Sequence, residues 1–176
     1  MEVTTPRLRL IALDTLTLEL YLVDPQKLET WLGFPVSRAV VTDTVERAIG
    51  IKLAKMAGAP RDEHAWYTSW LIVVQAERFG AGLVGFKGAP DITGSVELGY
   101  GIDPACQRKG YMTEAVGALV EWAFTDPRCR RVTAETLQEN AASIRVLEKN
   151  GLNRVGERGG MLYWAIDRRA WLSGRL

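Results

Sequence analysis

Histidine and cysteine are scarce in this chain of 176 residues, which contains one histidine, His64, and two cysteines, Cys106 and Cys129. A single imidazole gives little from which to build a histidine-based metal site or a Ser-His-Asp triad, so we predict no metal. The cysteines lack C-x-x-C spacing and are typical of reduced thiols rather than of a disulfide framework. His64 follows a polar stretch and is expected on the surface.

An excess of charge of one sign is also absent, because 22 lysines and arginines face 21 aspartates and glutamates, for a net charge of +1. Such a chain has no overall field to attract nucleic acid or a membrane surface. The longest strongly apolar runs, such as residues 70–74, are too short to span a bilayer, and the first residues lack a signal-type apolar core. We therefore expect a cytoplasmic protein with no nucleic-acid or membrane partner.

Hydrophobic residues make up 47% of the chain, which argues against disorder. The length fits a single domain over residues 1–176. Apolar periodicity and turn residues predict strands at 7–13, 69–76, 82–87, 96–102, 131–137, 153–157 and 161–166. They predict helices at 15–22, 26–32, 44–56, 112–125 and 140–150, with N-caps at Asp14, at Thr42 or Asp43, and at Asn140. This order indicates a mixed α/β sheet with helices on both faces.

The stretch at residues 94–116 carries the strongest functional pattern. A β-branched and aromatic run breaks at Asp103-Pro104, passes through a polar loop that holds Gly110, and continues as an amphipathic helix. This layout directs free backbone N–H groups at an anion, and Gly110 permits close approach to the main chain. Arg108 and Lys109 can add charge-assisted contacts. The pattern predicts a phosphate site; the alternative is an ordinary turn with solvated basic residues.

A second glycine pattern lies at residues 80–85, Gly-Ala-Gly-Leu-Val-Gly, which satisfies the G-x-G-x-x-G spacing of dinucleotide-binding proteins. That fingerprint requires a helix to open inside the motif. Gly88 and Pro90, which follow, are unsuited to a helix interior. We therefore interpret these glycines as hairpin residues rather than as a nicotinamide site.

Residues 107–112, Gln-Arg-Lys-Gly-Tyr-Met, resemble the Gln/Arg-x-x-Gly-x-Gly/Ala loop with which GNAT acetyltransferases hold the diphosphate of acetyl-coenzyme A. Residues 97–104 and 110–115 look like the branch that includes the ribosomal-protein N-terminal (alanine) acetyltransferases. The resemblance runs from about Thr5 to Trp171. It implies the GNAT fold, a central twisted, mixed but mostly antiparallel sheet flanked by helices. Met112 departs from the family, which usually has Gly or Ala there.

The resemblance also implies acetyl-coenzyme A as co-substrate, held by the loop, the strand before it and the start of a later helix. The residues carried over to this role are Tyr100, Gly101, Ile102, Gln107, Arg108, Lys109, Gly110, Tyr111, Met112, Thr113, Asn140 and Ser143. The acceptor implied is a primary amine of a protein N-terminus or of a small molecule. Dimers are common among relatives, so the resemblance also implies a possible homodimer.

Glu135 and Glu97 are the candidate general bases, because acyl transfer requires an amine that has lost its proton. Glu135 lies five residues before Asn140, the offset of a proposed base in the ribosomal-protein enzymes. Strand alternation places Glu97 on one side with Gly99 and Gly101, which predicts an open channel for the pantetheine arm. The alternative for both glutamates is a solvated carboxylate on a strand.

Ser143 resembles a serine that some relatives place near the cofactor thiol, and we include it among the catalytic candidates. Many GNAT enzymes have a general-acid tyrosine where this chain has Leu147. Either Ser143, Tyr111 or Tyr100 replaces it, or the thiolate, with a thiol pKa near about 8.5, leaves unprotonated. The missing tyrosine motivates a second hypothesis, an acyl-coenzyme A binding or sensing module with little turnover.

Direct transfer is expected, because Cys106 precedes the diphosphate loop and is badly placed as an acyl nucleophile. The six tryptophans are mainly core candidates. Trp31 and Trp66 flank the helices between the first two predicted strands, where GNAT proteins build much of the acceptor pocket. These two side chains are therefore also candidates for its lining.

Overall fold

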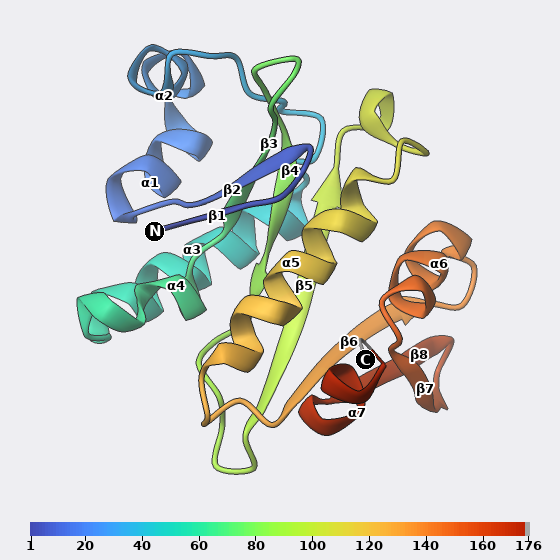
Figure 1. Cartoon of the computed structure of the whole chain (residues 1–176). Coiled ribbons are helices and arrows are strands. Elements are labelled where there is room, and N and C mark those ends of the chain that lie inside the picture. The colour runs from blue at the N-terminus through green and yellow to red at the C-terminus, as the bar shows by residue number, and fades with distance from the viewer. Residues whose placement is uncertain (175–176) are drawn as a thin grey trace.

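The computed structural model describes residues 1–174, in which one twisted sheet of eight strands has the order β1-β2-β3-β4-β5-β6-β8-β7 (Figure 1). Every neighbouring pair is antiparallel except β5 with β6. The predicted mixed, mostly antiparallel sheet is thereby confirmed. The strands are β1 (Glu2–Thr4), β2 (Leu8–Ala12), β3 (Trp70–Val74), β4 (Phe79–Phe86), β5 (Ser95–Ile102), β6 (Arg131–Leu137), β7 (Asn153–Arg158) and β8 (Met161–Asp167).

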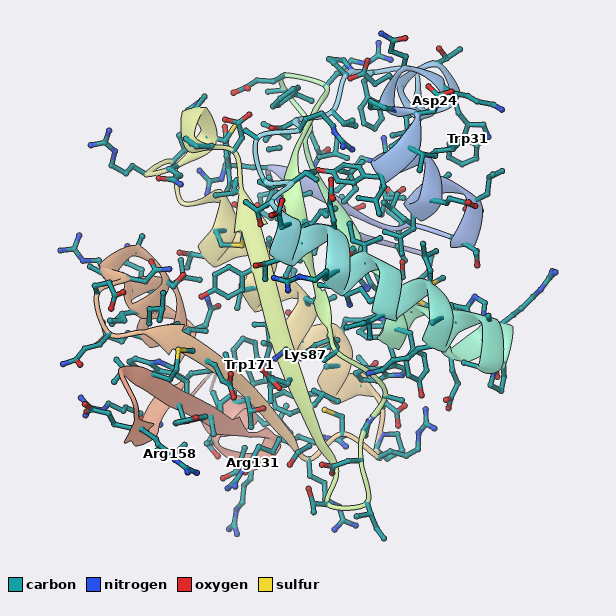
Figure 2. The ribbon with its side chains drawn as sticks, turned by 180° about the vertical axis from the view of Figure 1, so that it is seen from behind. Asp24, Trp31, Lys87, Arg131, Arg158 and Trp171 are labelled. Atoms are coloured by element: carbon teal, nitrogen blue, oxygen red, sulfur yellow. The ribbon has the colours of Figure 1, made fainter. Side chains whose placement is uncertain are left out.

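Helices cover both faces of the sheet, as the sequence predicted (Figures 1 and 2). They are α1 (Thr15–Val23), α2 (Pro25–Leu32), α3 (Asp43–Gly58), α4 (His64–Tyr67), α5 (Tyr111–Thr125), α6 (Ala141–Lys149) and α7 (Arg168–Ser173), with short 3-10 turns η1 (Arg61–Glu63) and η2 (Pro104–Cys106). No helix among residues 1–174 is long and apolar enough to cross a membrane.

Two hydrophobic cores result, one on each face of the sheet. On one face α5 buries Val116 and Leu119 against strand residues such as Leu98. On the other face Leu18 of α1 and Ile49 of α3 pack with alternate residues of β3. Because successive strand residues point to opposite faces, β3 supplies both cores and all five of its residues are buried.

The predicted helix starts are confirmed by their caps. The Asp14 side chain accepts a hydrogen bond from the Thr17 N–H at 2.8 Å, and Thr42 caps α3 in the same way at 3.3 Å. The Asn140 side chain accepts from the Ser143 N–H at 3.1 Å. Each bond satisfies one of the backbone donors that a helix start leaves without a partner.

The glycines of residues 80–85 all lie inside β4, which confirms a hairpin and excludes a helix opening within the motif. The strand begins at Phe79, so the predicted start at Gly82 was three residues late. A Cβ at Gly82 would lie 2.3 Å from the Gly101 carbonyl oxygen, so this glycine serves the close approach of β4 to β5.

Some predictions of exposure and structure were wrong. Trp31 is 64% exposed on the outside of α2 and belongs to neither core (Figure 2). Trp66 is buried and packs against Trp122, with ring centroids 4.5 Å apart, which confirms its prediction as a core residue rather than the alternative as pocket lining. His64 lies in the unpredicted helix α4 rather than in a loop, half-buried, with Nε2 at 3.1 Å from the Ala59 carbonyl oxygen. The short elements β1 and α7 were not predicted.

Strand β7 forms one edge of the sheet (Figure 1). Five of its six residues are exposed, among them Arg154, Glu157 and Arg158. Its pairing with β8 shifts register between Arg154 and Gly156. The edge is therefore charged and irregular.

Candidate functional site

The sheet forks where the parallel pair β5 and β6 separates. Their pairing runs from Ser95 opposite Arg131 to Leu98 opposite Ala134. Beyond that point β5 continues to Ile102 paired with β4 alone, and β6 continues to Leu137 paired with β8 alone, within the described residues. A parallel pair that separates exposes strand backbone from the interior of a sheet, which gives a ligand access to main-chain groups.

A cavity of about 490 Å³ lies beside this fork, between the loop before α5 and the start of α6. We call it the larger of the two cavities that meet at the fork. It contains every residue assigned to the cofactor except Lys109, namely Tyr100, Gly101, Ile102, Gln107, Arg108, Gly110, Tyr111, Met112, Thr113, Asn140 and Ser143. Lys109 instead directs its ammonium at the Glu77 carboxylate, 3.6 Å away. The structure thus brings residues 100–113 together with residues 140–149 around one cavity.

Sequence analysis missed two cations of this cavity, Arg145 and Lys149 on α6. Their spacing of four residues places them on the same side of the helix. That spacing is common on solvated helix faces, so the sequence alone did not single them out.

The loop presents its backbone to the cavity. Gly110 adopts φ +80° and Arg108 adopts φ +61°, so two left-handed residues bracket Lys109. Helix α5 begins at Tyr111, and no described side chain caps that end. Its first N–H groups and the positive end of its dipole therefore suit an anion. Met112 does not fill this space, because its side chain is mostly buried in the core beneath α5.

A second cavity, of about 170 Å³, lies on the opposite face of the sheet between α3 and strands β4 and β5. Its lining is mainly apolar and includes Val40, Val45, Ile49 and Leu83, with Gly85, Gly99 and Gly101 in its strand wall. Both cavities reach Tyr100 and Gly101. A group held at the fork is therefore approachable from either face. The glycine side of β5, which the sequence assigned to the pantetheine arm, faces this smaller cavity.

Lys52 of α3 forms part of the smaller cavity's wall. Its ammonium donates hydrogen bonds to the carbonyl oxygens of Tyr67 at 3.3 Å and Thr68 at 3.0 Å, and to that of Phe86. Burial, followed by the charges of Lys55 and Lys87, lowers the pKa of Lys52 to about 7. The three carbonyl bonds oppose this shift, because they favour the charged form. A positive group at this wall disfavours a second ammonium nearby.

The two candidate bases occupy different settings. Glu97 lies within the paired part of the ladder, opposite Thr133, and its carboxylate forms an ion pair with Lys87. Glu135 is exposed and is the first residue of β6 beyond the last pair with β5. Strand alternation places its side chain on the face of the smaller cavity. No ion pair of Glu135 occurs among residues 1–174, so its carboxylate remains available near the fork.

Tyr100 bridges the larger cavity. Its hydroxyl donates to the Ser143 carbonyl oxygen at 3.3 Å, which connects β5 with α6. Burial raises the pKa of Tyr100 to about 12, so the phenol keeps its proton at neutral pH.

Leu147, the residue in place of the family tyrosine, is fully buried in the core. Among the described residues there is no group of three or more His, Cys, Asp or Glu side chains placed to hold a metal ion.

Comparison with known proteins points to one family. The model of the acetyltransferase (GNAT) domain matches residues 7–153. A relative from Bacillus subtilis, the uncharacterized N-acetyltransferase YjdG, is 36% identical over 85 residues, which cover 48% of this chain and 51% of that protein. The chain is thus matched to about half the length of this relative.

Solved structures share the fold, among them two ribosomal-protein acetyltransferases. The ribosomal-protein-S5-alanine acetyltransferase from Vibrio fischeri is similar with a TM-score of 0.67 and 17% identity, covering 97% of this chain and 98% of that one. RimL, a ribosomal-protein acetyltransferase in complex with coenzyme A, gives a TM-score of 0.66 and 20% identity, covering 97% and 99%.

Proposed function

Because this chain belongs to the GNAT acetyltransferase family, we propose that it transfers the acetyl group of acetyl-coenzyme A directly to a primary amine. The observation that carries the proposal is the cavity at the fork, in which the loop, the strand end and the start of α6 meet. The smaller cavity on the other face gives the amine a separate approach to the same point.

The larger cavity fits acetyl-coenzyme A by the chemistry of its lining. The free N–H groups at the start of α5 and Arg108 suit the diphosphate, and Arg145 and Lys149 suit a further phosphate. Main-chain groups of β5 from Tyr100 to Ile102 suit the pantetheine amides. When bound, acetyl-coenzyme A supplies a thioester whose acyl carbon the amine attacks.

Glu135 is the proposed base. Acceptor amines have a pKa of about 8 for an α-amino group and about 10 for a lysine-type group, so most are protonated at neutral pH. A carboxylate at the fork, on the face of the smaller cavity, receives the proton directly or through water. A backbone N–H of β5 at the fork stabilises the negative charge that develops on the acyl oxygen.

The leaving thiolate has the Ser143 hydroxyl as its first candidate proton donor, because the Tyr100 hydroxyl already donates to the Ser143 carbonyl oxygen at 3.3 Å. Tyr111, the third candidate, has its hydroxyl 3.5 Å from the Glu77 carboxylate. A thiol pKa of about 8.5 also permits departure without a dedicated acid. Leu147 therefore does not oblige the chain to be a binding module without turnover.

The acceptor cavity is small and apolar, which favours an amine carried on a small apolar group. One fold neighbour is named for the alanine of ribosomal protein S5. A protein α-amine behind a small side chain is accordingly the first acceptor class to test, followed by small-molecule amines.

Ligand-dependent unfolding tests the proposal. Acetyl-coenzyme A and coenzyme A are expected to raise the melting temperature, while NAD leaves it unchanged, because a ligand bound only by the native state stabilises it. Release of thiol with a panel of peptide and small-molecule amines then separates an enzyme from a binding module. A rise with NAD alone, or with none of the three, would overturn the proposal.

Cys106→Ala is expected to leave turnover within about twofold of wild type. Cys106 lines the larger cavity, but burial and the charge of Asp103 raise the pKa of its thiol, so it is a poor nucleophile at neutral pH. The measurement is the rate of thiol release at saturating acetyl-coenzyme A. Loss of turnover with coenzyme A affinity retained would indicate an acyl-enzyme instead of direct transfer.

A further inference from the structure

The turn before β2 reaches the loop that precedes α5. The Nη1 of Arg7 donates to the Lys109 carbonyl oxygen at 2.9 Å, across 102 residues of sequence. Its Nε donates to Glu114 Oε2 at 2.6 Å, and its backbone N–H donates to Glu114 Oε1 at 2.9 Å. The guanidinium also lies over the Tyr111 ring, 5.0 Å from its centroid. Arg7 thus contacts both the loop and the first turn of α5.

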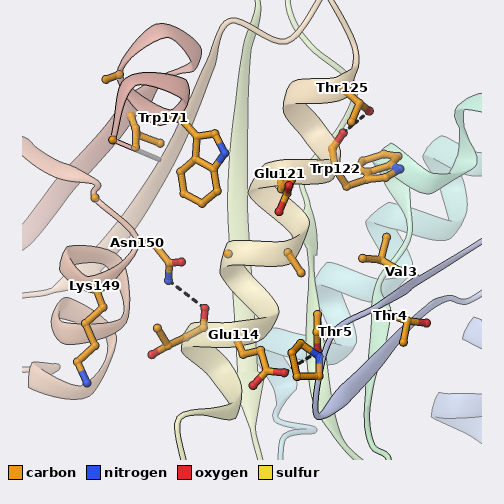
Figure 3. Close-up of a pocket in the computed structure, with 18 of the residues that line it drawn as sticks. Val3, Thr4, Thr5, Glu114, Glu121, Trp122, Thr125, Lys149, Asn150 and Trp171 are labelled. Atoms are coloured by element: carbon orange, nitrogen blue, oxygen red, sulfur yellow. Dashed lines mark hydrogen bonds between the residues drawn. The ribbon is translucent and has the colours of Figure 1, made fainter. Parts of the chain in front are cut away.

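Glu114 anchors this arrangement from the helix side. The Thr5 hydroxyl donates to Glu114 Oε1 at 2.6 Å, and Figure 3 shows the carboxylate directed at the turn that holds Thr5. Burial favours the protonated carboxyl, but the hydrogen bonds from Thr5 and Arg7 outweigh it and hold the pKa of Glu114 below its usual value. The carboxylate is therefore charged at neutral pH, and the pair with Arg7 is complete.

The bond to Lys109 has a geometric consequence for the loop. The carbonyl of Lys109 and the N–H of Gly110 belong to one planar trans peptide, so they point in opposite directions. Arg7 fixes the carbonyl, and it thereby directs the Gly110 N–H away from itself. The flanking residues Arg108 and Gly110 are both left-handed. Such a backbone costs about 1 kcal/mol or more at a non-glycine residue and persists where neighbours hold it.

We propose that Arg7, held by Glu114 and Thr5, is a positioning residue that preorganises the loop for the diphosphate of coenzyme A. This inference rests on the proposed function, because it takes the loop as the diphosphate site. Arg7 acts through the peptide between Lys109 and Gly110 rather than by touching the reacting atoms. Its effect is specific to ligands that carry a diphosphate.

The chain offers a matched control two residues away. Arg9 pairs with Glu2 through two guanidinium bonds, at 2.8 and 2.9 Å, and its side chain is exposed to a similar degree as that of Arg7. This pair joins β1 to β2 and has no contact with the loop among its hydrogen bonds. Arg9→Gln therefore removes an ion pair from the same segment and leaves the loop unaltered.

The experiment compares Arg7→Gln, Arg7→Lys and Arg9→Gln by calorimetric titration with coenzyme A and with pantetheine, which lacks the diphosphate. Arg7→Gln is expected to bind coenzyme A about 10- to 100-fold more weakly, the loss that follows when one hydrogen bond to a charged group is no longer well placed. The affinity of Arg7→Gln for pantetheine is expected to stay within about twofold of wild type. Arg9→Gln is expected to bind both coenzyme A and pantetheine within about twofold of wild type. Arg7→Lys keeps a positive charge but loses the planar guanidinium that bonds Glu114 and Lys109 at the same time, so it recovers part of the loss.

Equal loss for both ligands would show a general structural role and overturn the inference, as would coenzyme A binding by Arg7→Gln at wild-type strength. If Arg7→Gln does not fold, Glu114→Gln provides the same comparison, because it keeps an oxygen acceptor but removes the charge. Failure of the wild-type chain itself to bind coenzyme A would overturn the proposed function, and this inference with it.

Discussion

Gly110→Ala is expected to weaken coenzyme A binding by about 100-fold, the effect of losing one or two backbone hydrogen bonds to a charged diphosphate. Gly110 sits at φ +80° at the N-terminal end of α5, a conformation that L-residues adopt at a cost of about 1–2 kcal/mol. Its added Cβ would also lie 3.2 Å from Nη2 of Arg7. The loop can relieve both by turning the peptide that faces the larger cavity.

Gly160→Ala is the control for this prediction. Gly160 has φ +79° in the turn between β7 and β8, and a Cβ there meets nothing within 4 Å. Both variants are expected to lose about 1 kcal/mol of unfolding free energy from the left-handed backbone alone. Only Gly110→Ala loses affinity for coenzyme A in titration. Equal affinities of the two variants would mean that the loop does not hold the diphosphate.

Glu135→Gln is expected to reduce turnover by about 10²- to 10⁴-fold, the usual contribution of a general base. The substitution keeps the size and hydrogen-bonding capacity of the side chain but removes its basicity. Affinity for coenzyme A is expected to remain unchanged, because Glu135 is not among the residues that line the larger cavity. The measurements are the maximal rate of thiol release and the dissociation constant of coenzyme A.

The same change at Glu97 provides the comparison. The Glu97 carboxylate is engaged by Lys87 inside the paired part of the ladder, so Glu97→Gln is expected to change turnover by less than about fivefold. The rate of Glu135→Gln is expected to recover as the pH rises toward the pKa of the acceptor amine, of about 8 to 10, because free amine then needs no base. A larger loss in Glu97→Gln would reverse the assignment of the two glutamates.

Features set by nearby residues were predictable from the sequence. Gly110 between basic residues, at the end of a β-branched run, indicated a loop that opens a helix, and the structure has its left-handed backbone there. Asp14 and Asn140 were identified as caps, and Thr42 as one of two candidates with Asp43, because a cap bonds a donor only two or three residues away. These patterns depend on spacing within one turn, which a sequence shows directly.

Features set by distant segments were not predictable. Arg7 reaches the loop across 102 residues, and the Ser37 hydroxyl donates to the Asp103 carboxylate across 66 residues. Trp31 and Trp66 are the same residue type in similar helical surroundings, yet one is exposed and the other buried. Tertiary packing decides such cases. The fork likewise depends on where two strands separate, and neither strand carries a signal for it.

The charged edge strand β7 has a consequence for how copies of this chain behave when concentrated. An exposed strand edge offers unpaired backbone groups to a strand of another molecule and so promotes aggregation. On β7 an incoming strand would meet Arg154, Glu157 and Arg158, and a register shift that breaks the regular ladder. Sheet-to-sheet joining through this edge is therefore disfavoured, and the protein is protected there against the growth of continuous β-aggregates.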